Sequence, residues 1–474
     1  MLFHTPEFIG LLIVTLILFY WKPQSRIYLL TFANMLFYGV AGIGNLIIFI
    51  TVTILCYICS KNMRGRFARL SLWTGVGLVV VNLIFFKYIV FLMRTIEDLI
   101  PIQLIGEDSF FLSIVLPIGI SFYTFQVIAY MVDVYNRKAE PATTLLNFWV
   151  FISFFAHLVA GPIMRSNEFM PQIEKIKDIR FDSYKFKMGV GWFTIGLMKK
   201  IWLADYLSPY VNEFFARGSS LTGAEAWMAS YMFAFQIFFD FAAYSEMAVG
   251  LGYMFGITLA VNFITPYLST NATEFWRRWH ITLSTWIRHY IYIPLGGSRK
   301  GPVRQYTNLF IAMTISGIWH GAAWTYVLWG MYHGLLLIVH KLYTMLKEKL
   351  GLQAIDNSKV YHIITIFVFF HLTCIGWVLF RVQGLRNAAH MLRKMFSPEV
   401  LQFNGVLFPY FYIVLFLFAL HIGEYFLFKN ASSLYRGWHT RFPAPVRAVL
   451  YTVIVVFLMI YLKGDQNTFI YFQF

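Results

Sequence analysis

The chain has 474 residues, of which 59% are hydrophobic and 20% aromatic, whereas only 13% are Asp, Glu, Lys or Arg. A soluble domain carries about twice that charged fraction, so the composition excludes an ordinary soluble protein and indicates a chain that exposes apolar side chains to lipid. The net charge of +16 does not imply a nucleic acid partner, because Lys and Arg collect in the cytoplasmic loops of membrane proteins.

Long windows without Asp, Glu, Lys or Arg occur along the whole chain. A helix needs about 20 such residues to cross the hydrocarbon core, so most of these windows qualify as membrane spans. The two longest could each hold two short helices. The windows cover residues 27–60, 110–131, 141–164, 305–340, 360–380 and 404–423.

Shorter or lightly charged windows raise the expected number to roughly 11 to 13 membrane segments. The apolar N-terminal run lacks a basic flank and a small-residue cleavage site, so we expect a retained first helix. No repeat or long polar linker interrupts the chain, which predicts an all-α, polytopic membrane protein with one domain over residues 1–474. The additional windows are 8–20, 70–93, 188–207, 226–255 and 448–462.

The segment 271–304 is polar enough to lie at the membrane surface. Asn271 and Glu274 have the spacing of a capping box, which predicts a helix from residue 275 to about residue 292, ended by Pro294 and the glycine pair after it. One face of a continuous helix would carry Arg277, His280, Ser284 and Arg288, and the other would carry Trp279, Leu283, Trp286 and Tyr290. We therefore expect a polar-faced aromatic helix in the interface.

The window 305–340 contains an ionisable side chain at membrane depth. Ser316, His320 and Trp324 recur there at intervals of four residues, which would place them on one helical face. A histidine in such a place either serves a functional site or hydrogen-bonds to a neighbouring helix. His280 on the preceding helix makes the functional interpretation the stronger one.

The stretch 275–346 has no Asp or Glu and seven Lys or Arg. A histidine can act as a general base without a neighbouring carboxylate, although Asp240 or Glu246 could approach it in the fold. The basic stretch would suit a substrate with a polyphosphate group, and cytoplasmic loop placement explains the same charges. No metal-binding or phosphate-loop motif surrounds His280 or His320, so no metal is predicted.

The segments 276–297 and 316–324 resemble the signature of the membrane-bound O-acyltransferase superfamily, in the branch for alginate O-acetylation and related polysaccharide or D-alanyl transfer. The signature region covers about residues 240–335. Two positions depart from the branch pattern, since His289 and Glu246 stand where Asp is expected. Glu246 keeps a carboxylate, but His289 removes one, so His280 lacks an expected nearby acid. Further matching segments are 116–126, 133–135, 159–163, 240–245, 262–267 and 469–474.

The resemblance implies a helical bundle around a central tunnel, with re-entrant or interfacial helices. His320 would be the catalytic histidine at the centre, and His280 would lie toward the cytoplasmic mouth. Burial keeps the His320 imidazole neutral, so it could take a proton from an attacking hydroxyl. The residues expected to bind substrate are Arg277, Ser284, Arg288, Trp286, Trp319, Tyr123, Gln126 and Asn262.

The resemblance further implies that an acetyl group crosses a bacterial cytoplasmic (inner) membrane. The expected donor is acetyl-coenzyme A from the cytoplasm, with no permanently bound cofactor. An extracytoplasmic acetyltransferase or acceptor protein would relay the acetyl group to a polysaccharide. A tunnel would exclude the water that hydrolyses a thioester.

Three alternatives remain open. The first is D-alanyl transfer from a carrier protein to a cell-wall polymer, because the carrier presents the same thioester arm as coenzyme A. The second is a proton-coupled transporter, although the chain lacks the repeats and paired acidic sites that are usual in transporters. The third, a scaffold for polysaccharide assembly, would need no buried histidine.

The positive-inside bias predicts that Arg299, Lys300 and Arg304 face the cytoplasm together with the helix that bears His280. In a variant whose native cysteines are replaced, Ser298→Cys should react with a membrane-impermeant thiol reagent only after the membrane is opened. Labelling of intact cells from outside would invert this topology and the side from which the donor enters.

Overall fold

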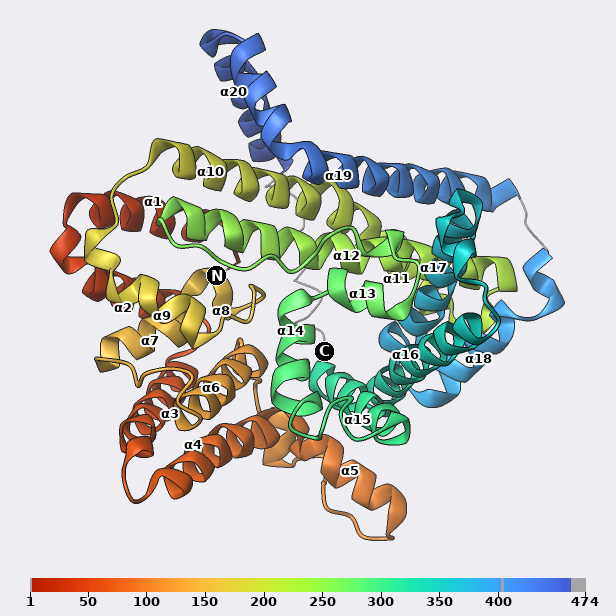
Figure 1. Ribbon diagram of the computed structural model, residues 1–474, viewed down its shortest axis with the longest axis horizontal. Coiled ribbons are helices and arrows are strands. Elements are labelled where there is room, and N and C mark those ends of the chain that lie inside the picture. Colours follow the sequence, from red (N-terminus) through yellow and green to blue (C-terminus); the bar gives the residue numbers. More distant parts are fainter. Residues whose placement is uncertain (1, 402–404, 462–474) are drawn as a thin grey trace. The chain divides into compact units, whose positions relative to one another are not determined.

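A computed structural model describes residues 2–401 and 405–461. Figure 1 shows helices joined by loops, and these residues include no β-strand, which confirms the all-α prediction. They divide into two compact units, one of residues 2–197 and 244–261 and the other of residues 198–243 and 262–461. The single domain over residues 1–474 stays a prediction. The matching segment 469–474 lies outside the described residues.

Within the described residues, four helical segments are long and apolar enough to cross a membrane. Shorter apolar helices occupy Pro6–Trp21 and Ala444–Leu458. The total of roughly 11 to 13 membrane segments stays a prediction. The four candidate spans are Ile43–Arg64, Ala68–Leu99, Lys359–Arg381 and Gly405–Asn430.

The first unit confirms that the window 27–60 holds two helices. Arg26, at the start of the first of them, is buried and donates hydrogen bonds to the carbonyl oxygens of Phe19, Ile176 and Ile179 at 2.7–2.9 Å. The helices are α1 (Pro6–Trp21), α2 (Arg26–Gly39), α3 (Ile43–Lys61), α4 (Ala68–Leu83), α5 (Ile89–Leu99), α6 (Ile120–Tyr135), α7 (Leu145–Ser153), α8 (Phe155–Leu158), α9 (Ser166–Glu174) and α10 (Ser183–Met198).

The second unit contains the signature segments. Its longest shared element is α12 (Gly223–Met254), which begins here and ends in the first unit. A capping box starts this helix, because Glu225 accepts the Thr222 N–H at 2.8 Å while Thr222 Oγ1 accepts the Glu225 N–H at 3.3 Å. The other helices are α11 (Asp205–Arg217), α13 (Ala272–Arg278), α14 (Ile281–Ile287), α15 (Pro302–His320), α16 (Trp324–Lys349), α17 (Lys359–Arg381), α18 (Leu385–Met395), α19 (Phe408–Arg441) and α20 (Ala444–Tyr461).

The prediction of one continuous helix over residues 275–292 is wrong. It is divided into α13, α14 and a π-helical turn η9 (Arg288–Tyr292), and Figure 1 shows α13 and α14 running in different directions. The break falls at His280, whose backbone is left-handed with φ 43°. The four polar residues predicted for one face therefore do not share one.

The window 305–340 contains two helices, α15 and α16, which form the hairpin seen side by side in Figure 1. Gly317 and Gly330 let their backbones meet, since a Cβ atom on Gly317 would lie 2.3 Å from the Tyr326 carbonyl oxygen. Gly321 is extended and ends α15 directly after His320. The placement of Trp324 on one face with Ser316 and His320 is therefore wrong, because Trp324 begins the next helix.

Replacing either interface glycine should separate the two helices of the hairpin. A Cβ on Gly330 would lie 2.4 Å from the Met313 carbonyl oxygen, and backbone atoms cannot rotate away. Gly317→Ala and Gly330→Ala should each destabilise the protein by about 1–3 kcal/mol or more, seen as a lower midpoint of thermal unfolding in detergent. Gly423→Ala is the control, because nothing lies within 4 Å of a Cβ at that helical position. An unchanged midpoint for Gly317→Ala and Gly330→Ala would contradict this packing.

Candidate active site

His280 stands at the junction of α13 and α14 and is completely buried. A left-handed backbone at a residue other than glycine costs about 1–3 kcal/mol and persists only where neighbours hold it. Asn262 supplies that support. Its carbonyl oxygen accepts the Ile281 N–H at 3.0 Å, and its side-chain Oδ1 accepts both the N–H (3.2 Å) and the hydroxyl (2.7 Å) of Thr282.

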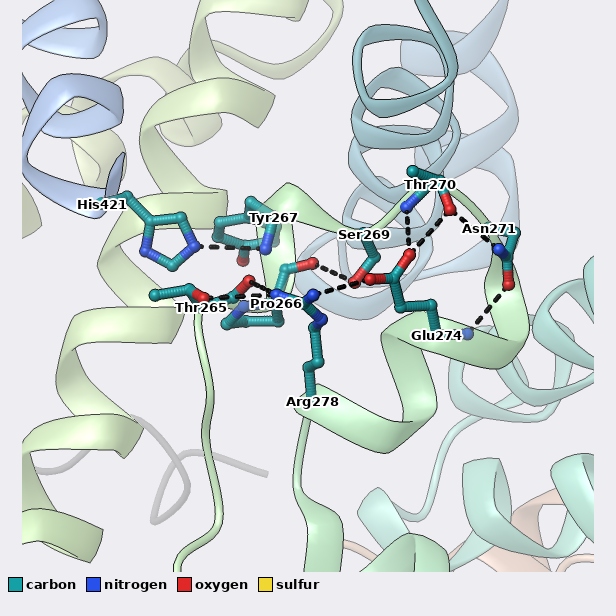
Figure 2. A network of polar contacts seen from close by, with 9 residues as sticks. All are labelled: Thr265, Pro266, Tyr267, Ser269, Thr270, Asn271, Glu274, Arg278 and His421. Carbon is teal, nitrogen blue, oxygen red and sulfur yellow. Dashed lines mark hydrogen bonds and ion pairs between the residues drawn. The ribbon is translucent and has the colours of Figure 1, made fainter. Parts of the chain in front are cut away.

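A polar network holds the loop before α13 (Figure 2). Asn271 caps the helix as predicted, with Oδ1 accepting the Glu274 N–H at 2.9 Å. The Glu274 carboxylate does not return to the cap residue. It accepts the N–H and the hydroxyl of Thr270 at 2.8 and 2.7 Å and pairs with Arg278 at 2.7 Å.

This network also connects to the segment that carries Asn262. Arg278 contacts Thr265, another left-handed residue, and the Arg278 carbonyl oxygen accepts the Ile264 N–H at 3.0 Å. Burial raises the pKa of the Glu274 carboxyl, but the hydrogen bonds from Thr270 and the charge of Arg278 outweigh it and leave that pKa below its ordinary value. Glu274 is therefore an ionised anchor for the turn that leads to His280.

The structure brings His280 and His320 to one indole ring. The ring centroid of Trp319 lies 6.0 Å from that of His280 and 5.0 Å from that of His320. Phe241 packs edge-on against His280 at 4.7 Å, while Trp329 and Phe380 do so against His320 at 4.8 and 5.2 Å. Both imidazoles thus lie in an aromatic, buried environment, where a neutral imidazole can accept a proton.

Two further buried histidines, which sequence reasoning missed, belong to the same aromatic cluster. His333 on α16 packs against Trp329 at 4.7 Å, and neither of its ring nitrogens has a hydrogen-bond partner in the described part of the chain. His421 on α19 packs against Phe238 at 4.7 Å and accepts the Tyr267 N–H at 3.2 Å. Their occurrence inside charge-free windows was the only signal in the sequence.

Ion pairs neutralise the buried charges of this unit. Lys200 in the π-helical segment η6 (Lys199–Ala204) is almost completely buried and pairs with Asp205 at 2.6 Å and Asp240 at 2.8 Å. Its neighbour Lys199 pairs with Glu424, which also contacts the Nδ1 atom of His421. Asp240, proposed as an approaching partner of a histidine, is thus paired with a lysine.

The remaining predicted residues of this unit differ in exposure. Arg277 and Arg288 are exposed, whereas Trp286 is buried and packs against Tyr290 at 5.2 Å. Ser284 donates its hydroxyl to the Trp279 carbonyl oxygen at 3.3 Å. His289, at the position where Asp was expected, contacts the Thr285 carbonyl oxygen through Nδ1 at 2.7 Å.

Tyr123 and Gln126 lie on α6 of the first unit. The Tyr123 hydroxyl accepts a hydrogen bond from Asn82 at 2.9 Å, and its ring stacks on Phe49. Gln126 is buried, and neither side-chain amide atom has a hydrogen-bond partner among residues 2–401 and 405–461. Their predicted roles in substrate binding stay predictions.

Comparison with known proteins gives a consistent set of relatives. The model of the "MBOAT, membrane-bound O-acyltransferase family" matches residues 142–379. A "Probable alginate O-acetylase AlgI" of Pseudomonas putida is 37% identical and aligns with 84% of this chain and 80% of its own length. A peptidoglycan O-acetyltransferase of Helicobacter pylori is 32% identical and aligns with 100% of this chain and 98% of its own length. A teichoic acid D-alanyltransferase of Bacillus subtilis is 27% identical and aligns with 56% of this chain and 68% of its own length.

The adjacent residues Arg277 and Arg278 offer a direct test of this site. Arg278→Ala removes the partner of Glu274 and should destabilise the protein by about 1.5–3 kcal/mol, seen as a lower midpoint of thermal unfolding. Arg277→Ala changes an exposed side chain and should alter stability by less than about 0.5 kcal/mol. Equal losses of stability in both variants would show that the Glu274–Arg278 pair does not hold the turn.

Proposed function

The chain belongs to the membrane-bound O-acyltransferase family and is a multi-pass membrane O-acyltransferase, and on that premise we propose that it transfers acetyl groups to a glycan. The relatives that align with most of the chain carry the names of an alginate O-acetylase and a peptidoglycan O-acetyltransferase. A cell-envelope or exported polysaccharide is therefore the proposed acceptor class, and the bacterial cytoplasmic membrane the proposed location.

One observation carries the proposed chemistry, namely that His280 and His320 both contact Trp319 inside one buried cluster. Acyl transfer to a hydroxyl needs a base for the hydroxyl proton and a site that excludes water from the thioester. His320 is the proposed base. His280 is the proposed group that positions the thioester or assists its departure, since the hydrogen bonds from Ile281 and Thr282 to Asn262 fix its place.

Acetyl-coenzyme A is the proposed donor, entering from the cytoplasm. The basic residues Arg299 and Lys300 lie exposed in the turn before α15 and could meet its phosphates. Asn308 attaches this turn to α15 by donating to the carbonyl oxygens of Leu295 and Gly297 at 3.3 and 3.0 Å. An extracytoplasmic acetyltransferase or acceptor protein is the proposed relay to the polysaccharide.

D-alanyl transfer from a carrier protein is the second candidate, because a teichoic acid D-alanyltransferase aligns with 56% of the chain. That relative has lower identity and lower coverage than the acetyltransferases, which favours acetyl transfer. Radiolabelled acetyl-coenzyme A and a D-alanyl carrier protein, offered separately to the purified protein, distinguish the two donors.

Purified variants should separate the roles of the two histidines. His320→Ala removes the proposed base and should lower acetyl transfer from radiolabelled acetyl-coenzyme A by about a hundredfold to ten-thousandfold, while the protein still inserts and folds. His280→Ala should weaken donor binding as well as turnover. His280→Asn is the matched variant, because Asn tolerates the left-handed backbone and isolates the loss of the imidazole.

Near wild-type transfer by folded His320→Ala would refute the assignment of the base. If the His280 variants bind the donor normally but lose acetyl transfer, His280 would act in the chemical step together with His320 rather than in donor binding.

A further inference from the structure

A polar cleft of about 580 Å³ lies at the C-terminal end of α17, between the last turn of α11 and the start of α18. Its volume is in the range of about 300–1,000 Å³ that is usual for small-molecule sites. The lining includes two arginines, Arg217 and Arg381, together with hydroxyl, amide and imidazole groups. No part of the proposed reaction uses these residues.

The two arginines differ in how their charges are balanced. Arg217 pairs with Glu225 at 2.8 Å. Arg381 donates to the side-chain oxygen of Asn212 at 2.9 Å and stacks over Phe215 at 5.3 Å, and no carboxylate in the described residues forms an ion pair with it. The cleft therefore holds one uncompensated guanidinium, which is a donor fork for a carboxylate or a phosphate.

The other polar groups of the cleft favour a ligand rich in hydroxyls. Ser219, Gln383 and Asn387 line it, and the Nε2 atom of His390 is buried without a hydrogen-bond partner in the described part of the chain. A lipid phosphate would need the arginine but few of these neutral donors and acceptors. An acidic sugar residue would use both.

The cleft lies at the end of α17 opposite to the basic turn 299–304 and to the lysines at the end of α16. A helix of 23 residues is about 34 Å long and crosses the hydrocarbon core. Lys347, near the end of α16, pairs with Asp356 just before α17 begins, and the α15–α16 hairpin returns the chain to the side of the basic turn 299–304. If the basic segments are cytoplasmic, Arg381 is at the extracytoplasmic surface.

The cleft and the candidate active site are both in contact with the last turn of α17. Phe380, the residue before Arg381, packs against the His320 ring at 5.2 Å. We propose that the cleft is a glycan-binding subsite, in which Arg381 binds the carboxylate of an acidic sugar residue of the polysaccharide that the relay protein acetylates. The proposal rests on the proposed function.

Binding of glycan to the full-length protein in zwitterionic lipid nanodiscs tests the subsite without any transfer. A short oligouronate should bind, and its carboxyl-reduced, neutral counterpart should bind at least about tenfold more weakly, because a charge-assisted hydrogen bond is lost. Arg381→Gln should weaken oligouronate binding by a similar factor. Gln383→Glu places a negative charge in the cleft at an exposed position and should do the same without a folding cost.

Arg386→Gln is the control, since Arg386 is an exposed arginine on α18 outside the lining. Equal binding of the charged and neutral oligosaccharides, or wild-type binding by Arg381→Gln and Gln383→Glu, would overturn the subsite. So would displacement of the oligouronate by phosphatidylglycerol added to the nanodiscs, which would assign the cleft to lipid. Loss of acetyl transfer with intact binding would count against the proposed function alone.

Discussion

The side chain of Asn262 is the contact on which the geometry of the candidate site depends. One amide oxygen accepts two hydrogen bonds from Thr282, and the neighbouring main-chain oxygen accepts the Ile281 N–H. These bonds fix the first turn of α14 against the segment before α13. The chain must therefore reverse direction between Asn262 and Ile281. His280 takes the left-handed backbone that this reversal requires, and its imidazole is thereby turned into the aromatic cluster around Trp319.

The buried charges of the second unit are also held by specific partners. Burying an unpaired charge in an apolar surrounding costs far more than burying an ion pair, so each lysine of η6 is placed beside carboxylates. Lys200 connects η6 to α12 through Asp240, and Lys199 connects it to α19 through Glu424. Because Glu424 also contacts His421, and His421 accepts the Tyr267 N–H, the turn ahead of α13 is held from two directions.

The sequence predicted helices and the cap at Asn271, because apolar windows and capping spacing are local patterns, and the family motifs drew attention to His280 and His320. The sequence did not predict the helix break at His280, because neither position 279 nor position 280 is a glycine or proline. The contacts that hold the break come from Asn262, which is distant in the sequence. The sequence also failed at Trp324 because a window without charges does not show where one helix ends. His333 and His421 have no local motif, and only packing brings them to the cluster.

The contact of Gly317 and Gly330 has a mechanical consequence. Two helices whose backbones touch leave no side-chain layer between them that could be compressed or sheared, and lipid cannot enter such a seam. His320 ends one of these helices, one turn beyond Gly317, so its position relative to the hairpin does not depend on the fluidity of the bilayer. A change in lipid composition would thus leave this histidine in register with the partner helix α16.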